Sequence, residues 1–184
     1  MTKNFFEFCT TFFKKTIDKL LGLWYNKRVR LRKKREEHPM KVITCETITR
    51  TYTNNGQHAE QTLAYTLTHE IRSHDHVPFD EGSDIPEFHM SVKSSKASLM
   101  SGNRCTAQTK EGIIQEFIER SASTCFAYVA SDFAKAYVMD AVEFTEFCML
   151  FAGLSRESTR NGGKVKVQLR AESKRMREWL EGHN

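Results

Sequence analysis

The stretch that decides the fold reads SDIPEFHMSVKSSKASLM and covers residues 83–100. It begins with an acid at Asp84, continues through a bend marked by Pro86, and then alternates polar and apolar residues as a strand does. Positions two apart on a strand share one face, so Ser91 and Lys93 are expected on the same side. We therefore predict a hairpin whose returning strand carries the lysine close to Asp84.

Lys93 has two interpretations from the sequence. The neighbouring residues in the strand are small or apolar, and a charged amine is costly to place among them unless an anionic partner lies nearby. That interpretation favours a functional site. The alternative is an edge strand in which Lys93 lies in water beside Lys96 and prevents pairing with another sheet edge.

Periodicity on both sides of this stretch predicts a mixed α/β domain that begins at residue 39. Residues 40–53 are rich in Val, Ile and Thr and predict a strand, and residues 57–70 predict a helix with Glu60 in its first turn. The helix dipole alone favours an acid there, so Glu60 also has a purely structural explanation. The later part of the chain predicts, in order, a helix at 111–120, paired apolar strands at 124–130 and 135–140, a helix at 141–152 ended by Gly153, a turn at 160–163, a strand at 164–170 and a helix at 173–180.

These residues have the chemistry that phosphodiester cleavage requires. A divalent cation polarises the phosphate and activates a water, and hard cations such as Mg²⁺ take oxygen ligands. Asp84 and Glu60 are candidate carboxylate ligands, the backbone carbonyl of Val92 is a third candidate, and Ser91 is a weak one because its hydroxyl is neutral. Lys93 is the candidate catalytic amine, because a cation beside the phosphate stabilises charge that develops in the transition state.

This part of the chain resembles the PD-(D/E)xK superfamily of restriction-endonuclease-like nucleases. The resemblance lies in a helix with Glu60, a loop before Asp84, the SVKS segment with Lys93, and the helix and strand that follow. The resemblance covers about residues 57–152 and implies an αβββαβ core with a mixed central sheet flanked by helices. It implies that Asp84 binds the metal, that Lys93 assists the nucleophilic water, and that Glu60 is the helix glutamate many members use. It also implies Mg²⁺ as cofactor, with Mn²⁺ as a substitute, and DNA cleaved to 5′-phosphate and 3′-hydroxyl ends.

The sequence departs from the superfamily pattern at two positions. Ser83 stands where the motif has a proline, and Ser91 stands where it has Asp or Glu. Serine removes one negative charge from the site, and we expect Glu60 to supply the missing carboxylate, with Glu87 and Asp80 as the alternates. The predicted function is a Mg²⁺-dependent DNA endonuclease, for example a small type II restriction enzyme, and double-strand cutting favours a homodimer because one site cuts one strand. The alternative is a non-catalytic nucleic-acid-binding protein that kept the fold.

Charge is distributed unevenly along the 184 residues. Residues 1–37 hold eleven Lys and Arg against four acids (+7), residues 156–184 hold eight against four (+4), and the middle holds nine against fifteen (−6). Basic ends suit a polyanion, and apolar residues at helical spacing predict an amphipathic helical arm at 1–38. Two other interpretations of the arm are a solvated helix that packs on the domain, and a peripheral membrane or assembly element that binds an anionic surface. The candidate nucleic-acid-binding residues are Lys27, Arg28, Arg30, Arg32, Lys33, Lys34, Arg35, Arg160, Lys164 and Lys166.

The five cysteines are scattered and form no CxxC pair. This pattern argues against a disulfide framework and against a zinc site, and it favours a reducing compartment. The apolar N-terminus is interrupted by charges too often for a membrane span and carries no secretory signal pattern. The expected location is the cytoplasm.

Overall fold

The computed structural model describes residues 40–48, 52, 54–70, 83–100, 107, 109–156 and 165–183. The predicted arm at 1–38, with all of its basic residues, lies outside the described residues. The predicted turn at 160–163 and two candidate phosphate-binding residues, Arg160 and Lys164, lie outside them as well.

The two apolar runs in the middle of the chain form the centre of a mixed four-stranded sheet. Strands β4 (Cys125–Val129) and β5 (Lys135–Met139) pair antiparallel across a tight turn, and most of their residues are buried, as predicted. Strand β1 (Lys41–Thr44) pairs antiparallel with β5, and β2 (Met90–Ser94) pairs parallel with β4. The strand order is therefore β1-β5-β4-β2, which leaves β2 at one edge.

A second sheet contains three antiparallel strands, in the order β3 (Ser98–Met100), β7 (Val165–Leu169) and β6 (Ala152–Arg156). The prediction of a helix that continues to residue 152 and ends at Gly153 is wrong. Helix α4 (Ala141–Phe151) ends one residue earlier, and Gly153 lies inside β6 opposite Gln168.

The predicted hairpin and the predicted first strand are each wrong in part. Only Lys41–Thr44 is strand within the described residues of 40–53. Asp84 does not lie on a strand, since the pairing before β2 is a single bridge between Ile85 and Met90 around a short 3-10 helix, η1 (Pro86–Phe88). The chain then leaves the first sheet after β2, and β3 pairs in the second sheet.

Among the described residues, each α-helix begins after a side chain that accepts a hydrogen bond from a backbone N–H of the first turn. The Asp140 cap of α4 is a full capping box, because Glu143 also accepts from the Asp140 backbone. The other three helices, with their capping residues, are α2 (Asn55–Thr68) after Asn54, α3 (Lys110–Arg120) after Thr109 and α5 (Lys174–Glu181) after Ser173.

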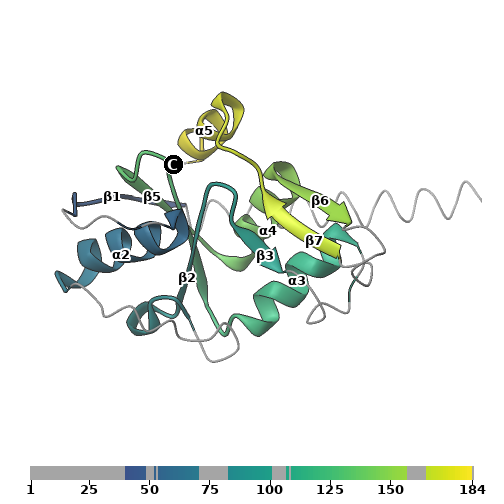
Figure 1. Cartoon of the computed structure of the whole chain (residues 1–184), viewed down its shortest axis with the longest axis horizontal. Helices are drawn as coiled ribbons and strands as arrows, with labels where there is room; N and C mark the ends of the chain where they lie inside the picture. Colours follow the sequence, from purple (N-terminus) through teal and green to yellow (C-terminus); the bar gives the residue numbers. More distant parts are fainter. Residues whose placement is uncertain are drawn as a thin grey trace, which may run out of the picture. The chain divides into compact units, whose positions relative to one another are not determined.

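Helices cover both faces of the first sheet. Ala59 and Leu63 of α2 pack in one cluster with Val92, Ala127 and Val129. Alternate residues of the same strands, such as Phe126 and Tyr128, pack in a second cluster against α3 and α4. Figure 1 shows α2 on one side of β2 and α3 on the other.

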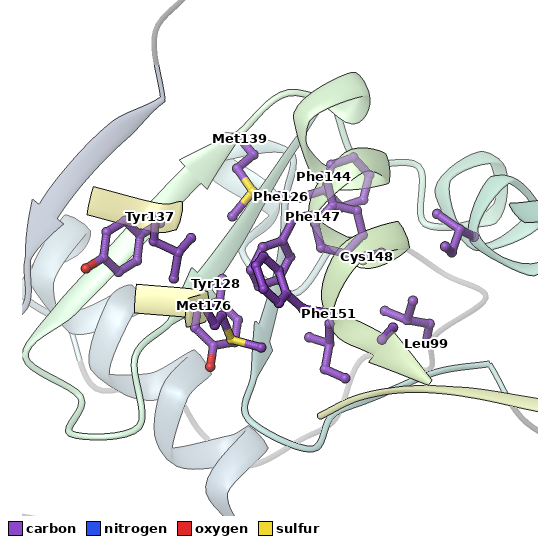
Figure 2. Packing of buried hydrophobic residues seen from close by; sticks show 14 of the residues in the cluster. Leu99, Phe126, Tyr128, Tyr137, Met139, Phe144, Phe147, Cys148, Phe151 and Met176 are labelled. Atoms are coloured by element: carbon purple, nitrogen blue, oxygen red, sulfur yellow. The ribbon is translucent and has the colours of Figure 1, made fainter. Parts of the chain in front are cut away.

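Aromatic rings fill the second cluster. The rings of Phe126 and Phe144 are stacked with centroids 4.5 Å apart, and Phe117 lies 5.9 Å from Phe144. Phe147 contacts Tyr128 with ring centroids 5.0 Å apart (Figure 2). These side chains pack α3 and α4 against the sheet.

The protein is thus a mixed α/β protein with a mixed four-stranded sheet, a second sheet and flanking helices. Within the described part of the chain, no helix is both long enough and apolar enough to cross a membrane.

Candidate functional site

The candidate site lies at the edge of β2 that faces away from β4, which is free of other strands within the described residues. The backbone N–H of Val92 donates to Asp84 Oδ2 at 2.6 Å, and the Val92 carbonyl accepts from Lys93 Nζ at 2.7 Å. In a parallel strand the N–H and C=O of one residue point to the same side, so these groups face away from β4. The side chains of Asp84 and Lys93 therefore form hydrogen bonds with backbone groups that would otherwise need water or another strand as partner.

The loop before β2 places Asp84 against this edge. Ile85 and Met90 exchange two backbone hydrogen bonds, with N···O distances of 2.9 and 3.2 Å, and these close the loop around η1. His89 completes the turn with a left-handed φ of 45°. Two local features thus position the acid, which explains how a sequence separation of nine residues brings Asp84 to Lys93.

Asp84 accepts every one of its hydrogen bonds from described residues through a single oxygen. Oδ2 accepts from Ser91 Oγ at 3.0 Å, from Val92 N at 2.6 Å and from Lys93 Nζ at 3.1 Å. Three donors therefore converge on this one oxygen. Within the described part of the chain, the second oxygen, Oδ1, has no hydrogen-bond partner.

Lys93 is 9% exposed, and it does not lie in water as the structural alternative required. Its ammonium donates to Asp84 Oδ2, to Ser91 Oγ at 3.1 Å and to Val92 O. It also lies 5.2 Å from the centre of the Phe117 ring, within cation–π distance. The buried charge is therefore paired, and the prediction that Lys93 has an anionic neighbour is confirmed.

Glu60 approaches the same edge from α2. The pKa of Glu60 is raised from 4.5 to about 7, mainly by burial and then by the Asp84 charge, while the Lys93 charge acts in the opposite direction. Because the helix begins at Asn55, Glu60 lies beyond the first turn, and the predicted placement there is wrong. The helix dipole consequently does not explain this acid, whereas the neighbouring charges of Asp84 and Lys93 tie it to the site.

A pocket of about 570 Å³ opens beside these groups. Three segments line it: the start of α2, the second half of β2, and the turn that leads to β3. Its lining contains small, hydroxyl, amide and charged side chains and no aromatic ring; the residues are Asn54, Asn55, Gly56, Glu60, Val92, Lys93, Ser94, Ser95, Lys96, Ala97 and Ser98.

The structure brings five sequence-predicted residues together: Glu60, Asp84, Ser91, Val92 and Lys93. It does not bring Lys166 to the pocket, since that residue lies in β7 of the second sheet, opposite Ser155.

The sequence interpretation missed the pocket wall at residues 94–98. The feature of the sequence that could have indicated this wall is the run of small residues after Lys93, because small side chains leave room beside a strand edge.

The sequence interpretation also missed the hydrogen bonds and the ion pair that centre on the Glu172 carboxylate, which we call the Glu172 hub. The side chain of Glu172 is buried, and its carboxylate accepts from Tyr128 Oη at 3.2 Å and from the Ser131 backbone N–H at 2.8 Å. It also forms an ion pair with Arg177, and its own backbone N–H donates to Ser95 Oγ at 3.3 Å. The hub fastens α5 and the pocket turn to β4.

The donor set fits a hard divalent cation. The Asp84 carboxylate, the Glu60 carboxylate and the Val92 carbonyl all offer oxygens, which Mg²⁺ and Mn²⁺ prefer. Burial and then repulsion by Asp84 raise the pKa of Glu60, and a cation there would offset the repulsion. Nowhere among the described residues do three or more His, Cys, Asp or Glu side chains gather, so water would have to complete the coordination, as is usual for Mg²⁺.

No family model, no curated protein and no solved structure matches this chain.

Proposed function

We propose that the domain at 39–184 is a Mg²⁺-dependent DNA endonuclease of the restriction-endonuclease-like, PD-(D/E)xK type. The observation that carries the proposal is the meeting of Asp84 and Lys93 at the free edge of β2, with Glu60 coupled to both. A buried lysine, two carboxylates and a strand carbonyl beside an open polar pocket suit metal-assisted hydrolysis of a phosphodiester.

The order of elements supports the proposed fold. Helix α2, the Ile85–Met90 bridge, β2, β3, α3 and β4 follow one another in the expected αβββαβ sequence. The α3 crossover joins β2 to the parallel strand β4. The departures are the single bridge in place of a first strand and the pairing of β3 in a second sheet.

Each side chain has a distinct role in the proposed reaction. When bound, a divalent cation polarises the scissile phosphate and lowers the pKa of a water. Asp84 and Glu60 hold that cation, and Val92 contributes a carbonyl whose position is fixed by the strand. Lys93 donates to the phosphate oxygens and stabilises the charge that they gain.

Ser91 stands at the position where the motif has an acid, but it offers no carboxylate to a metal. Its hydroxyl donates to Asp84 and accepts from Lys93, so it orients both partners while adding no charge. Glu60 supplies the second carboxylate in this proposal. Because its pKa is about 7, Glu60 is fully ionised only in mildly alkaline solution or beside a cation.

The proposed substrate is double-stranded DNA, held at its phosphates by the basic residues of 27–35, by Arg160 and by Lys164 and Lys166. Cutting both strands requires two sites, so the active form in this proposal is a homodimer. Mn²⁺ is expected to replace Mg²⁺, and the products carry 5′-phosphate and 3′-hydroxyl ends.

The test is a plasmid-nicking assay on the full chain with Mg²⁺ or Mn²⁺. Glu60→Gln, Asp84→Asn and Lys93→Met should each lower the nicking rate by at least about a hundredfold. Glu111→Gln in the first turn of α3 and Lys174→Met at the start of α5 are matched controls on exposed positions, and they should cut at the wild-type rate.

An intact plasmid in both metals, over many DNA sequences, would overturn the nuclease proposal. If the chain then still bound DNA with a steep salt dependence, the non-catalytic nucleic-acid-binding function would replace it. Flotation of the chain with anionic vesicles, without DNA binding, would instead support the membrane-peripheral role.

A further inference from the structure

We infer that the Lys93 ammonium and a divalent cation compete for one set of oxygens, so that metal binding releases the lysine for its role on the phosphate. The inference rests on the proposed function, and it adds a switch that the reaction scheme above does not contain.

The oxygens around Lys93 are the candidate metal ligands. The ammonium lies 3.1 Å from Asp84 Oδ2, 3.1 Å from Ser91 Oγ and 2.7 Å from Val92 O. The sequence assigned the metal to Asp84, to Glu60, to the Val92 carbonyl and, weakly, to Ser91, and the ammonium contacts three of these four residues. These oxygens therefore form one site for a cation, and the ammonium of Lys93 occupies it.

The hydrogen bonds of this amine are saturated. An ammonium has three N–H donors, and Lys93 Nζ has three oxygen acceptors within 3.1 Å. The ring of Phe117 lies 5.2 Å from the nitrogen. In this arrangement no N–H is left to donate to a phosphate, so the proposed catalytic role requires the amine to give up at least one of its partners.

The ammonium and a divalent cation cannot share this position. Mg²⁺ binds oxygen at about 2.0–2.1 Å, and a second positive charge within a few ångströms is strongly repelled in a buried site. A metal bound to Asp84 and Val92 would therefore expel the ammonium. Lys93 also lines the pocket of about 570 Å³, so its flexible stem has space to carry the amine toward a bound phosphate.

The first arm of the test measures Mn²⁺ binding to the full chain by calorimetric titration in mildly alkaline buffer. Lys93→Met removes the competing ammonium and should bind Mn²⁺ about 5- to 150-fold more tightly than the wild type, the usual range for coupled ligands. Lys96→Met is the matched control, because it removes a positive charge from the same pocket without touching the oxygens. It should change the affinity by less than about threefold. Asp84→Asn should abolish binding.

The second arm uses wild-type protein, in case Lys93→Met does not fold. Acylation of individual lysines by an activated ester is followed by mass spectrometry with and without Mn²⁺. Lys93 should react slowly without the metal and several-fold faster with it, while the exposed Lys96 serves as internal reference and keeps its rate.

The outcomes separate this inference from the proposed function. If Mn²⁺ binds through Asp84 but Lys93→Met binds it no more tightly and the acylation rate of Lys93 does not rise, the competition is refuted and the metal site stands. If no Mn²⁺ binding depends on Asp84, the metal site of the proposed nuclease fails and the competition fails with it.

Discussion

Replacing Glu60 by Gln should stabilise the protein in alkaline, metal-free buffer. Burial beside Asp84 raises the pKa of Glu60 from its ordinary 4.5 to about 7, so the folded state binds a proton more tightly than the unfolded chain does. Glutamine resembles the protonated acid in shape and lacks the charge. The substitution therefore removes a carboxylate that the fold does not favour.

The magnitude follows from the two pKa values. Stability from the raised pKa is fully present below pH 4.5 and is lost as the pH rises through about 7. The full difference corresponds to about 3 kcal/mol. Glu60→Gln should accordingly raise the free energy of unfolding by about 3 kcal/mol near pH 8, and by less than about 1 kcal/mol near pH 5.

The assay is urea unfolding of the full chain in chelator at several pH values, with Glu111→Gln as the control. The control replaces an exposed glutamate in the first turn of α3, so the difference between control and wild type should not change across this range. A Glu60→Gln effect that is constant with pH, or that destabilises near pH 8, would refute the reasoning about burial and charge.

Two further predictions concern the framework that holds the site. Glu172→Gln removes the charge that pairs with Arg177 and weakens the acceptor for Tyr128 and the Ser131 backbone. It should lower the free energy of unfolding in urea by about 1–3 kcal/mol. A loss no larger than that of the exposed control Glu178→Gln would contradict the hub. Phe144→Ala removes a fully buried ring stacked on Phe126 and should cost about 3–5 kcal/mol, whereas a cost below about 1 kcal/mol in the same measurement would mean that α4 does not pack as described.

Local signals made much of this structure predictable. The β4–β5 hairpin followed from two short apolar runs around a turn, and α3, α4 and α5 followed from apolar residues at helical spacing. The meeting of Asp84 and Lys93 was also predictable, because a short loop and the two-residue period of a strand decide it.

Long-range pairing was not predictable in the same way. The residues of β6, AGLSR, show no strand pattern, and they become a strand because β7 pairs with them. The departure of β3 from the first sheet depends on the turn in which Lys96 has a left-handed φ of 64°. The hub at Glu172 was invisible because its partners Tyr128 and Ser131 lie more than 40 positions away. Such contacts depend on how the sheets assemble.

The most direct test of the central claim is the rate at which the full chain nicks supercoiled plasmid in Mg²⁺, compared between wild type and Asp84→Asn. The account predicts Mg²⁺-dependent nicking by the wild type that leaves 5′-phosphate ends, and a rate at least about a hundredfold lower for the variant. Equal rates, or nicking that survives removal of Mg²⁺ by chelator, would contradict the assignment of Asp84 and its neighbours as a metal-dependent phosphodiesterase site.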